Sequence, residues 1–301
     1  MLASSNNILH MAKHVLPNQI AWRLEKALYQ SGVKSAANLT LPDFLCVGFR
    51  KTGTTWLFEN LHHHPDIYLP PYKNVRYFSD DFHTPLRGYA KHFSTAGGRV
   101  AGDFSNSYAF VSEAKIRFIR AVMPQVKLVV LLRDPVEREW SEFLHRLTMA
   151  NQDISSLSDN EIRQSLATAP LASAGGYTPL IDKWLSVLPK EQLFVGFYEQ
   201  METQPRKLLS DLFTFLGVTT DIDWDDVPHN KVIIPPAGEQ YESHDPWRGV
   251  IATKPRNTSA LLPEHHRTFL RELYERELVA LRACYGDRVA HWGRERERVA
   301  A

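Results

Sequence analysis

A short segment that follows an apolar run has the side chains and spacing of an anion-binding loop. The run Phe44–Gly48 leads through Phe49 into Arg50–Thr55, and a predicted helix starts there. Such a loop directs backbone N–H groups, a helix N-terminus and an ammonium group at one point, which suits a phosphate-like anion. In the common phosphate-binding loop the lysine follows the second glycine, whereas Lys51 precedes Gly53. This order argues against the common nucleoside-triphosphate hydrolases and kinases.

A second element that could bind an anion follows the apolar run Lys127–Leu132. Arg133 ends that run, and Ser141 lies about two helical turns further on. A guanidinium fork and a hydroxyl group together can clamp a phosphate, and ligands of open α/β sheets usually bind at strand ends. The alternative for Arg133 is an ion pair with Asp134 or another nearby acid.

The elements that must position these residues alternate along the chain. Apolar runs predict strands at 44–48, 99–104, 127–132 and 193–197, and helical periodicity predicts helices at 54–63, 112–123, 136–149, 205–216 and 263–284. Alternation of this kind predicts an α/β, P-loop-like three-layer fold with a central, mostly parallel sheet flanked by helices.

The same patterns divide the chain. Residues 1–40, with an amphipathic helix at 18–29, are predicted to form an N-terminal arm, 41–293 the main domain, and 294–301 a charged tail. Periodicity is lost at 219–260, where prolines and glycines gather. Long irregular segments in compact domains are often lids or binding loops, so we expect a lid or substrate loop there.

Composition bounds the class of protein. The 301 residues have a formal net charge of +1 and are 44% hydrophobic, which fits a soluble globular protein and gives no reason to expect a nucleic-acid partner. Two cysteines are too few for a disulfide framework. The first residues are polar and no apolar run reaches the length of a membrane span. We therefore expect a cytoplasmic protein without a membrane span, and a homodimer is left open.

Taken together, the two anion-binding elements resemble the sulfotransferase superfamily that uses 3′-phosphoadenosine 5′-phosphosulfate (PAPS). The resemblance is to the branch that includes heparan sulfate sulfotransferases and many bacterial small-molecule enzymes. It extends in order to four further segments: His64-Pro65 with Lys73–Phe78, Gly102–Tyr108, Tyr177–Trp184, and Gln192–Gly217. Residues 41–293 are therefore expected to be a sulfotransferase domain.

The resemblance implies a role for each anion site. The first loop would hold the 5′-phosphosulfate of the donor, and Arg133 with Ser141 would hold its 3′-phosphate. Lys51 would stabilise the negative charge that builds on the leaving group. The expected donor-binding set is Arg50, Lys51, Thr52, Gly53, Thr54, Thr55, Trp56, Arg133 and Ser141.

The acceptor side departs from the family pattern. Heparan-type enzymes place a glutamate base where this chain has Asn74, and an amide cannot take a proton at neutral pH. Two substitutes are predicted: His145, four residues after Ser141 on one helix face and with a suitable ordinary pKa, and Asp103. Each has a structural alternative: His145 as an exposed or satisfied helix histidine, and Asp103 as a structural carboxylate that orients Lys51 or caps a turn. The expected acceptor-binding residues are Asn74, Arg76, Tyr77, Phe78 and Tyr108.

The sequence thus predicts sulfuryl transfer from PAPS to a hydroxyl or amine of a small molecule or sugar, without a metal. The run His62-His63-His64 does not favour a metal site, because consecutive helical residues point about 100° apart. Two rival functions are a P-loop kinase-like phosphotransferase, with Asp134 as its metal-binding acid, and a nucleotide-binding module that has lost catalysis. The second rival is prompted by Asn74 and by Phe104, which stands where the family has a lysine.

Overall fold

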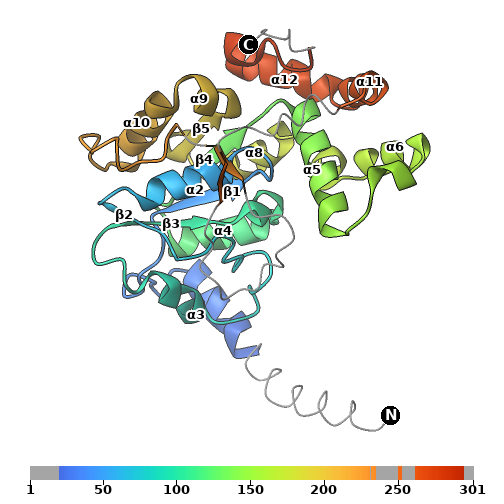
Figure 1. Cartoon of the computed structure of the whole chain (residues 1–301). Coiled ribbons are helices and arrows are strands. Elements are labelled where there is room, and N and C mark those ends of the chain that lie inside the picture. Colours follow the sequence, from blue (N-terminus) through green and yellow to red (C-terminus); the bar gives the residue numbers. More distant parts are fainter. Residues whose placement is uncertain (1–19, 231, 235–249, 253–261, 295–301) are drawn as a thin grey trace, which may run out of the picture.

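A five-stranded parallel sheet forms the centre of the molecule. The computed structural model describes residues 20–230, 232–234, 250–252 and 262–294. Its main sheet has the strand order β2-β3-β1-β4-β5, and every neighbouring pair is parallel (Figure 1). The strands are β1 (Phe44–Gly48), β2 (Ile67–Tyr68), β3 (Val100–Phe104), β4 (Lys127–Leu132) and β5 (Leu193–Phe197).

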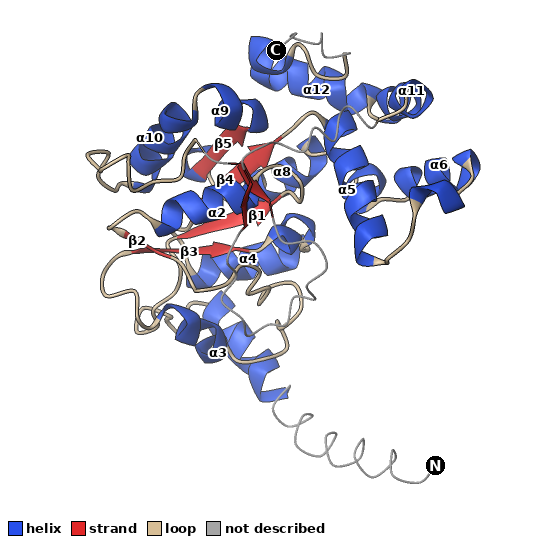
Figure 2. Ribbon diagram, in the orientation of Figure 1, coloured by secondary structure: helices blue, strands red, loops and turns tan. Residues whose placement is uncertain are grey.

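The central strands are apolar throughout because both faces of the sheet are covered by helices. In β1, Phe44 and Cys46 pack in one hydrophobic cluster, while Leu45 and Val47 pack in the other. The residues of β4 divide between the same two clusters. This alternation places the sheet between two helical layers, as Figure 2 shows, and confirms the predicted three-layer fold.

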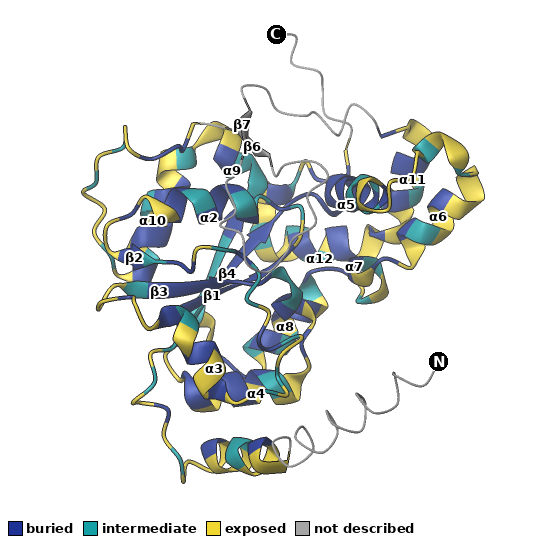
Figure 3. Ribbon diagram, turned by 60° about the horizontal axis from the view of Figure 1, so that its bottom comes forward, coloured by how far each residue is buried: buried dark blue, intermediate teal, exposed yellow. Residues whose placement is uncertain are grey.

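Each layer is built from its own set of helices. One face of the sheet is covered by α2 (Thr54–His62), α9 (Tyr198–Thr203) and α10 (Pro205–Leu216). The opposite face is covered by α4 (Glu113–Val122), α8 (Thr178–Leu185) and the helix at residues 20–30. In Figure 3 the central strands β1, β3 and β4 are mostly buried and the outer faces of the helices are exposed.

A third group of helices extends from one end of the sheet. It contains α5 (Pro135–Met149), α6 (Asp159–Ala167) and α11 (Glu264–Leu273), which contact one another, together with α12 (Glu275–Tyr285) (Figure 1). Shorter elements complete the described chain: α3 (Leu86–Ala90), α7 (Pro170–Ser173) and the 3₁₀ turns Lys91–Phe93, Asn106–Phe110, Ile154–Ser156, Lys190–Gln192 and Gly286–Val289.

The single helix predicted at 263–284 is wrong. The structure has two helices, α11 and α12, which meet at Tyr274. Tyr274 is 2% exposed, and its hydroxyl group donates a 2.7 Å hydrogen bond to the buried Glu139 of α5. The helix therefore breaks at a buried tyrosine. In the sequence, Tyr274 fits the helical periodicity like any other core residue, so the break could not be predicted from the pattern.

The segment predicted to be irregular, 219–260, contains regular structure in its described part. Strands β6 (Val232–Ile234) and β7 (Val250–Ala252) pair in an antiparallel two-stranded sheet. That part of the prediction is wrong, because two short apolar runs separated by many residues can still pair. The lid function stays a prediction, and residues 231, 235–249 and 253–261 lie outside the described part of the chain.

The N-terminal arm is held by a buried tryptophan. Trp22 is 1% exposed, contacts Phe82 and Phe118 edge to face, and donates from Nε1 to the Phe82 carbonyl at 2.8 Å. The described part of the arm, residues 20–30, therefore packs on the main domain. Residues 1–19 and the predicted tail at 295–301 lie outside the described residues.

Gly102 offers a test of how tightly the sheet packs. It pairs with Phe44 across β3 and β1, and a Cβ at this position would overlap the Phe44 ring. We expect Gly102→Ala to lower the free energy of unfolding by about 1–3 kcal/mol through overpacking, measured by denaturant titration. Gly88→Ala is the matched control, since Gly88 is exposed in α3 with open space around it, and should be neutral or stabilising by up to about 1 kcal/mol. Equal effects of the two substitutions would contradict this account.

Candidate active site

The predicted anion-binding loop lies between the carboxyl end of β1 and the N-terminus of α2. Lys51 and Gly53 both adopt left-handed backbone conformations, with φ of 66° and 87°. Thr52 is fully buried and donates from its hydroxyl group to the Phe49 carbonyl at 2.7 Å, which closes the turn. Glycine is favoured at position 53 by its φ, and a Cβ there would also have to displace the end of the Met201 side chain of α9. We call residues 49–55 the donor loop.

The start of α2 is open to an anion. Gly53 stands at the N-cap, no side chain among the described residues caps the helix, and its first turn contains no acid. The first N–H groups of a helix need acceptors from outside the helix, and the helix dipole favours a negative charge there. A phosphate or sulfate group would supply such acceptors.

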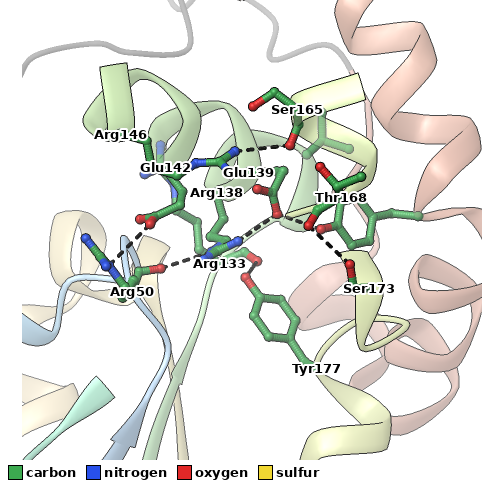
Figure 4. A network of polar contacts seen from close by, with 12 residues as sticks. Arg50, Arg133, Arg138, Glu139, Glu142, Arg146, Ser165, Thr168, Ser173 and Tyr177 are labelled. Carbon is green, nitrogen blue, oxygen red and sulfur yellow. Dashed lines mark hydrogen bonds and ion pairs between the residues drawn. The ribbon is translucent and has the colours of Figure 1, made fainter. Parts of the chain in front are cut away.

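Two arginines hold the backbone of the donor loop. Arg138 of α5 donates from Nε to the Arg50 carbonyl at 3.0 Å, and Arg133 donates to the Lys51 carbonyl at 3.3 Å. Figure 4 shows Arg138 between this loop and Glu139, with which it forms a buried ion pair at 2.7 Å. The loop at the end of β1 is thereby fixed to the end of β4 and the helix that follows it.

Side chains from α5 also face the loop. Arg50 forms a 3.2 Å ion pair with the buried Glu142 (Figure 4). Arg138, Glu142 and His145 recur at intervals of four and three residues, so they share one face of α5, and Ser141 lies beside them. Arg133 and His145 therefore lie near the donor loop, and Ser141 stands on α5 between Arg138 and His145.

Lys51 lies in a concentration of positive charge. Burial lowers its pKa from the ordinary value, Glu142 opposes this shift, and Arg133, Arg50 and Arg138 add to it. Since positive neighbours disfavour the ammonium form, an arriving anion would relieve their mutual repulsion. The charge around Lys51 therefore favours an anionic ligand.

Arg133 has capacity left for a ligand. It is 6% exposed, its guanidinium group lies over the Tyr198 ring at 4.5 Å, and its Nε has no hydrogen-bond partner among the described residues. Buried polar atoms are normally paired, so an unpaired guanidinium N–H at the end of a strand favours an anionic ligand. Together with the open end of α2, this atom shows that the residues present fit a phosphate-bearing donor.

Two of the predicted donor-binding residues support the loop from inside. Thr52 closes the turn, and Trp56 packs with the cluster formed by α2 and α10. Thr54 is 4% exposed and Thr55 is half-buried, and both stand in the first turn of α2. Lys51, the hydroxyl groups of Thr54 and Thr55, and the N–H groups of α2 are therefore the groups on this side that could donate to an anion.

His145 is half-buried and electrostatically coupled to Lys51. Burial lowers its pKa below the ordinary value, Lys51 lowers it further, Glu142 opposes, and Arg50 adds a smaller lowering. The imidazole is therefore neutral at pH 7, which is the form that accepts a proton.

Asp103, the second predicted base, is engaged in the core. Its carboxylate is fully buried and accepts hydrogen bonds from Tyr89 at 2.8 Å, Tyr108 at 2.8 Å and Ser105 at 2.7 Å. Burial raises its pKa, and these three hydrogen bonds oppose the rise. The geometry favours the structural alternative, in which the carboxylate organises its neighbours.

The predicted acceptor-binding residues divide into two kinds. Tyr77, Phe78 and Tyr108 are each at most 2% exposed and belong to an aromatic cluster with Tyr89. Asn74 is half-buried and Arg76 is exposed, and both have left-handed backbone conformations. The described structure therefore leaves Asn74 and Arg76 as the members of this set that a substrate could contact directly.

The backbone of Asn74 and Arg76 is tied to the end of β3. The Asn74 N–H donates to the Phe104 carbonyl at 2.7 Å, and the Arg76 N–H donates to Ser105 Oγ at 3.0 Å. Arg76 also lies 3.6 Å from Asp80, in an exposed ion pair. Such pairs contribute little energy, so Arg76 can exchange Asp80 for an anionic substrate.

Three residues near the loop were missed by sequence reasoning: Lys73, Arg138 and Glu142. Lys73 donates from its ammonium group to Thr54 Oγ1 and Thr55 Oγ1, each at 3.1 Å. Arg138 and Glu142 carried a signal, since they flank Ser141 and His145 at helical spacing. The signal for Lys73 was weaker: it directly precedes Asn74 in a segment whose pattern already suggested the site.

Asp134, the proposed metal-binding acid of the kinase-like rival, and His64 of the histidine run are both hydrogen-bonded to backbone groups. Asp134 accepts from the Val136 N–H at 2.9 Å and from the Gly293 N–H at 2.7 Å, and burial raises its pKa to about 6. It caps α5 and does not present a free carboxylate to a metal. In the run His62-His63-His64, both ring nitrogens of His64 are hydrogen-bonded to the backbone, at Thr219 and Asp66.

The chain belongs to the sulfotransferase family. The model of the sulfotransferase domain family matches residues 41–231. The chain is 28% identical over 199 residues to the bifunctional heparan sulfate N-deacetylase/N-sulfotransferase 4 of Mus musculus, and the match covers 60% of this chain and 22% of that protein. It is 27% identical over 196 residues to the corresponding protein 3 of Homo sapiens, with 59% and 22% covered. The chain thus spans about a fifth of the length of these relatives.

A solved structure shows the same fold. The sulfotransferase from Alicyclobacillus acidocaldarius superposes with a TM-score of 0.57 at 24% identity, covering 81% of this chain and 95% of that one. Within the described residues, no helix combines the length and apolar character needed to cross a membrane.

Asp103 allows a test that separates structure from chemistry. We expect Asp103→Asn to lower the free energy of unfolding by about 1–3 kcal/mol, because three buried donors lose a charged acceptor. The rate of sulfate transfer per folded molecule should change less than about tenfold, whereas loss of a general base costs about 10²–10⁴-fold. Denaturant titration and initial rates measure the two effects. Tyr89→Phe, which removes one donor to the same carboxylate, should follow the same pattern. A loss of transfer beyond a hundredfold with unchanged stability would restore Asp103 as the base.

Proposed function

We propose that this protein transfers a sulfuryl group from PAPS to a hydroxyl or amine of a small molecule or sugar. The observation that supports this most is the donor loop, which joins an uncapped helix N-terminus, Lys51 and the unpaired Nε of Arg133. Family membership supports sulfuryl transfer, and the loop together with Arg133 and Ser141 would supply groups for both ends of the donor.

The donor would be held at two points. The N–H groups of α2, Lys51 and Thr55 would bind the 5′-phosphosulfate, and Arg133 with Ser141 would bind the 3′-phosphate. The acceptor oxygen or nitrogen attacks sulfur while the bond from sulfur to the bridging phosphate oxygen breaks, and the electron pair leaves on that oxygen. Lys51 stabilises this developing charge, so positioning and electrostatics supply most of the catalysis.

His145 would accept the proton of the attacking group. It faces the donor loop on the same side of α5 as Glu142, and its pKa is lowered by burial and by Lys51. Asn74 would orient the acceptor through its amide group. In this proposal Asp103 has a supporting role only.

The acceptor is proposed to carry negative charge. Arg76 is exposed beside Asn74, and its ion pair with Asp80 is loose at 3.6 Å. The relatives are named for heparan sulfate N-sulfotransferase activity, which makes an amino sugar within an anionic carbohydrate a suitable first acceptor to test. A cytoplasmic location and a homodimer stay predictions.

Donor binding is tested by titrating adenosine 3′,5′-bisphosphate, the product left after transfer, in a calorimeter. We expect micromolar binding by the parent protein and a loss of about ten- to a hundredfold for Lys51→Met and for Arg133→Gln, since each removes a charge-assisted hydrogen bond. Arg117→Gln is the control, because Arg117 is exposed on α4 and its ion pair within the described part of the chain is with Glu113. Binding that is unchanged in both site variants would reject the assignment of the donor site.

Transfer is tested separately with labelled PAPS and a panel of amino and hydroxylated sugars, scored by a gain of one sulfate on the acceptor. Transfer without added Mg²⁺ would exclude the kinase-like rival. Tight binding of the bisphosphate with no transfer to any acceptor would instead favour the module that has lost catalysis, which Asn74 in place of the family glutamate suggests.

The pH dependence of transfer reports on His145. A base must be unprotonated to act, and the pKa of His145 is lowered from 6.5, so the acid limb of kcat/KM should have its midpoint below the ordinary histidine pKa. In Arg50→Gln the loss of a nearby positive charge, and of the partner of Glu142, should move this acid limb to higher pH. Rates measured from pH 5 to 8 test the shift. An acid limb that does not respond to Arg50 and persists in His145→Gln would exclude His145 as the base.

A further inference from the structure

Lys73 is a buried cation for which the transfer chemistry above has no role. Its side chain is 4% exposed, and its ammonium group donates at 3.1 Å to both Thr54 Oγ1 and Thr55 Oγ1. No ion pair of Lys73 with a carboxylate occurs among the described residues. Burying an ammonium group without such a partner is unfavourable, which calls for an explanation.

The two hydrogen bonds fix the direction of the threonine hydroxyl groups. An ammonium group can only donate, so Thr54 and Thr55 must accept from Lys73 through their oxygen lone pairs. Each hydroxyl hydrogen must then point away from Lys73, and neither has an acceptor among the described residues. Both hydroxyl groups belong to the first turn of α2, where the helix N–H groups also need acceptors.

We propose that Lys73 is a positioning residue for the sulfuryl donor: its ammonium group orients the hydroxyl groups of Thr54 and Thr55 to donate to the phosphosulfate. Its charge also adds to the attraction for that anion. The inference rests on the proposed function and deepens it, because it assigns to Lys73 a role in donor binding that acts through Thr54 and Thr55.

The surroundings of Lys73 come from three elements. Cys46 of β1 and Glu59 of α2 favour its charged form, while Lys51 and Arg50 of the donor loop disfavour it. Burial is the largest influence and lowers the pKa of Lys73 from 10.5 to about 8. The folded protein therefore binds this proton less well than the unfolded chain does, so the charged lysine destabilises the fold below pH 8, and the penalty disappears as the pH rises from about 8 to 10.5. Lys73 is thus a residue that serves binding at a cost to stability.

Binding of adenosine 3′,5′-bisphosphate to three variants tests the role. We expect Lys73→Met to weaken binding at pH 7 by about ten- to a hundredfold, the range of a charge-assisted hydrogen bond, and Lys73→Arg to weaken it less. Lys91→Met, at an exposed lysine of the turn Lys91–Phe93, is the control and should bind like the parent. The denaturation midpoint of Lys73→Met at pH 7 should equal or exceed that of the parent. Binding within twofold of the parent, or a lower midpoint with unchanged affinity, would overturn the proposal in favour of a structural lysine.

A double-mutant cycle tests whether Lys73 acts through the hydroxyl groups. In a Thr54→Val/Thr55→Val background, Lys73→Met should weaken binding by a smaller factor than in the parent, because the groups that it orients are gone. Equal factors in both backgrounds would overturn the proposed mechanism. The cycle compares affinities only, so it does not depend on transfer activity.

The pH dependence of affinity gives an independent readout. Above pH 7.5 the phosphates are fully charged, and the parent should lose affinity up to pH 9.5 as Lys73 deprotonates. Lys73→Arg keeps its charge over this range, so its affinity should fall less, and the residual slope belongs to Lys51. Identical slopes would contradict the role of Lys73. If the parent itself does not bind the bisphosphate, the proposed function fails together with this inference; if the parent binds and Lys73→Met binds equally, only this inference fails.

Discussion

The conformation of the donor loop is the constraint on which the rest of the site depends. Lys51 adopts φ of 66°, which costs a residue with a side chain roughly 1–2 kcal/mol. Two guanidinium groups offset this cost by donating to the consecutive carbonyls of Arg50 and Lys51. Because these arginines stand at the end of β4 and on α5, the neighbouring strand determines the shape of the loop that follows β1.

The arginines that hold the donor loop require negatively charged partners in turn. A buried guanidinium group is unfavourable without an acidic partner. Glu139 supplies this partner to Arg138, at 2.7 Å. Glu139 also accepts from Tyr274, at the break between α11 and α12. The C-terminal helices therefore support the donor loop through a chain of three polar contacts, although they lie far from the loop in sequence.

The sequence allowed the frame of the fold to be predicted, and with it that the loop after β1 and Arg133 lie close together. Strands β1, β4 and β5 are continuous apolar runs because both faces of the sheet are covered, so their bounds could be read directly. The loop and Arg133 each follow such a strand, and parallel strands bring their carboxyl ends to one edge. The roles of Asp103 and Lys73 could not be predicted, because they depend on tertiary contacts. Asp103 is a core carboxylate only because Tyr89 and Tyr108 close over it, and Lys73 meets its threonines across 18 and 19 residues of chain. Neither contact leaves a periodic pattern in the sequence.

The short segment from Lys73 to Arg76 connects the donor loop to the residues proposed to bind the acceptor. Lys73 contacts the donor loop, Asn74 is half-buried and Arg76 is exposed. The left-handed backbone of Asn74 and Arg76 is held by the Phe104 carbonyl and by Ser105 Oγ, and Ser105 in turn donates to Asp103. Asp103 is thus linked to the backbone of Arg76 through the Ser105 hydroxyl group and makes no direct contact with Arg76. A segment fixed at both ends can hold the acceptor at a set distance from the donor, and in-line transfer gains most of its rate from such positioning.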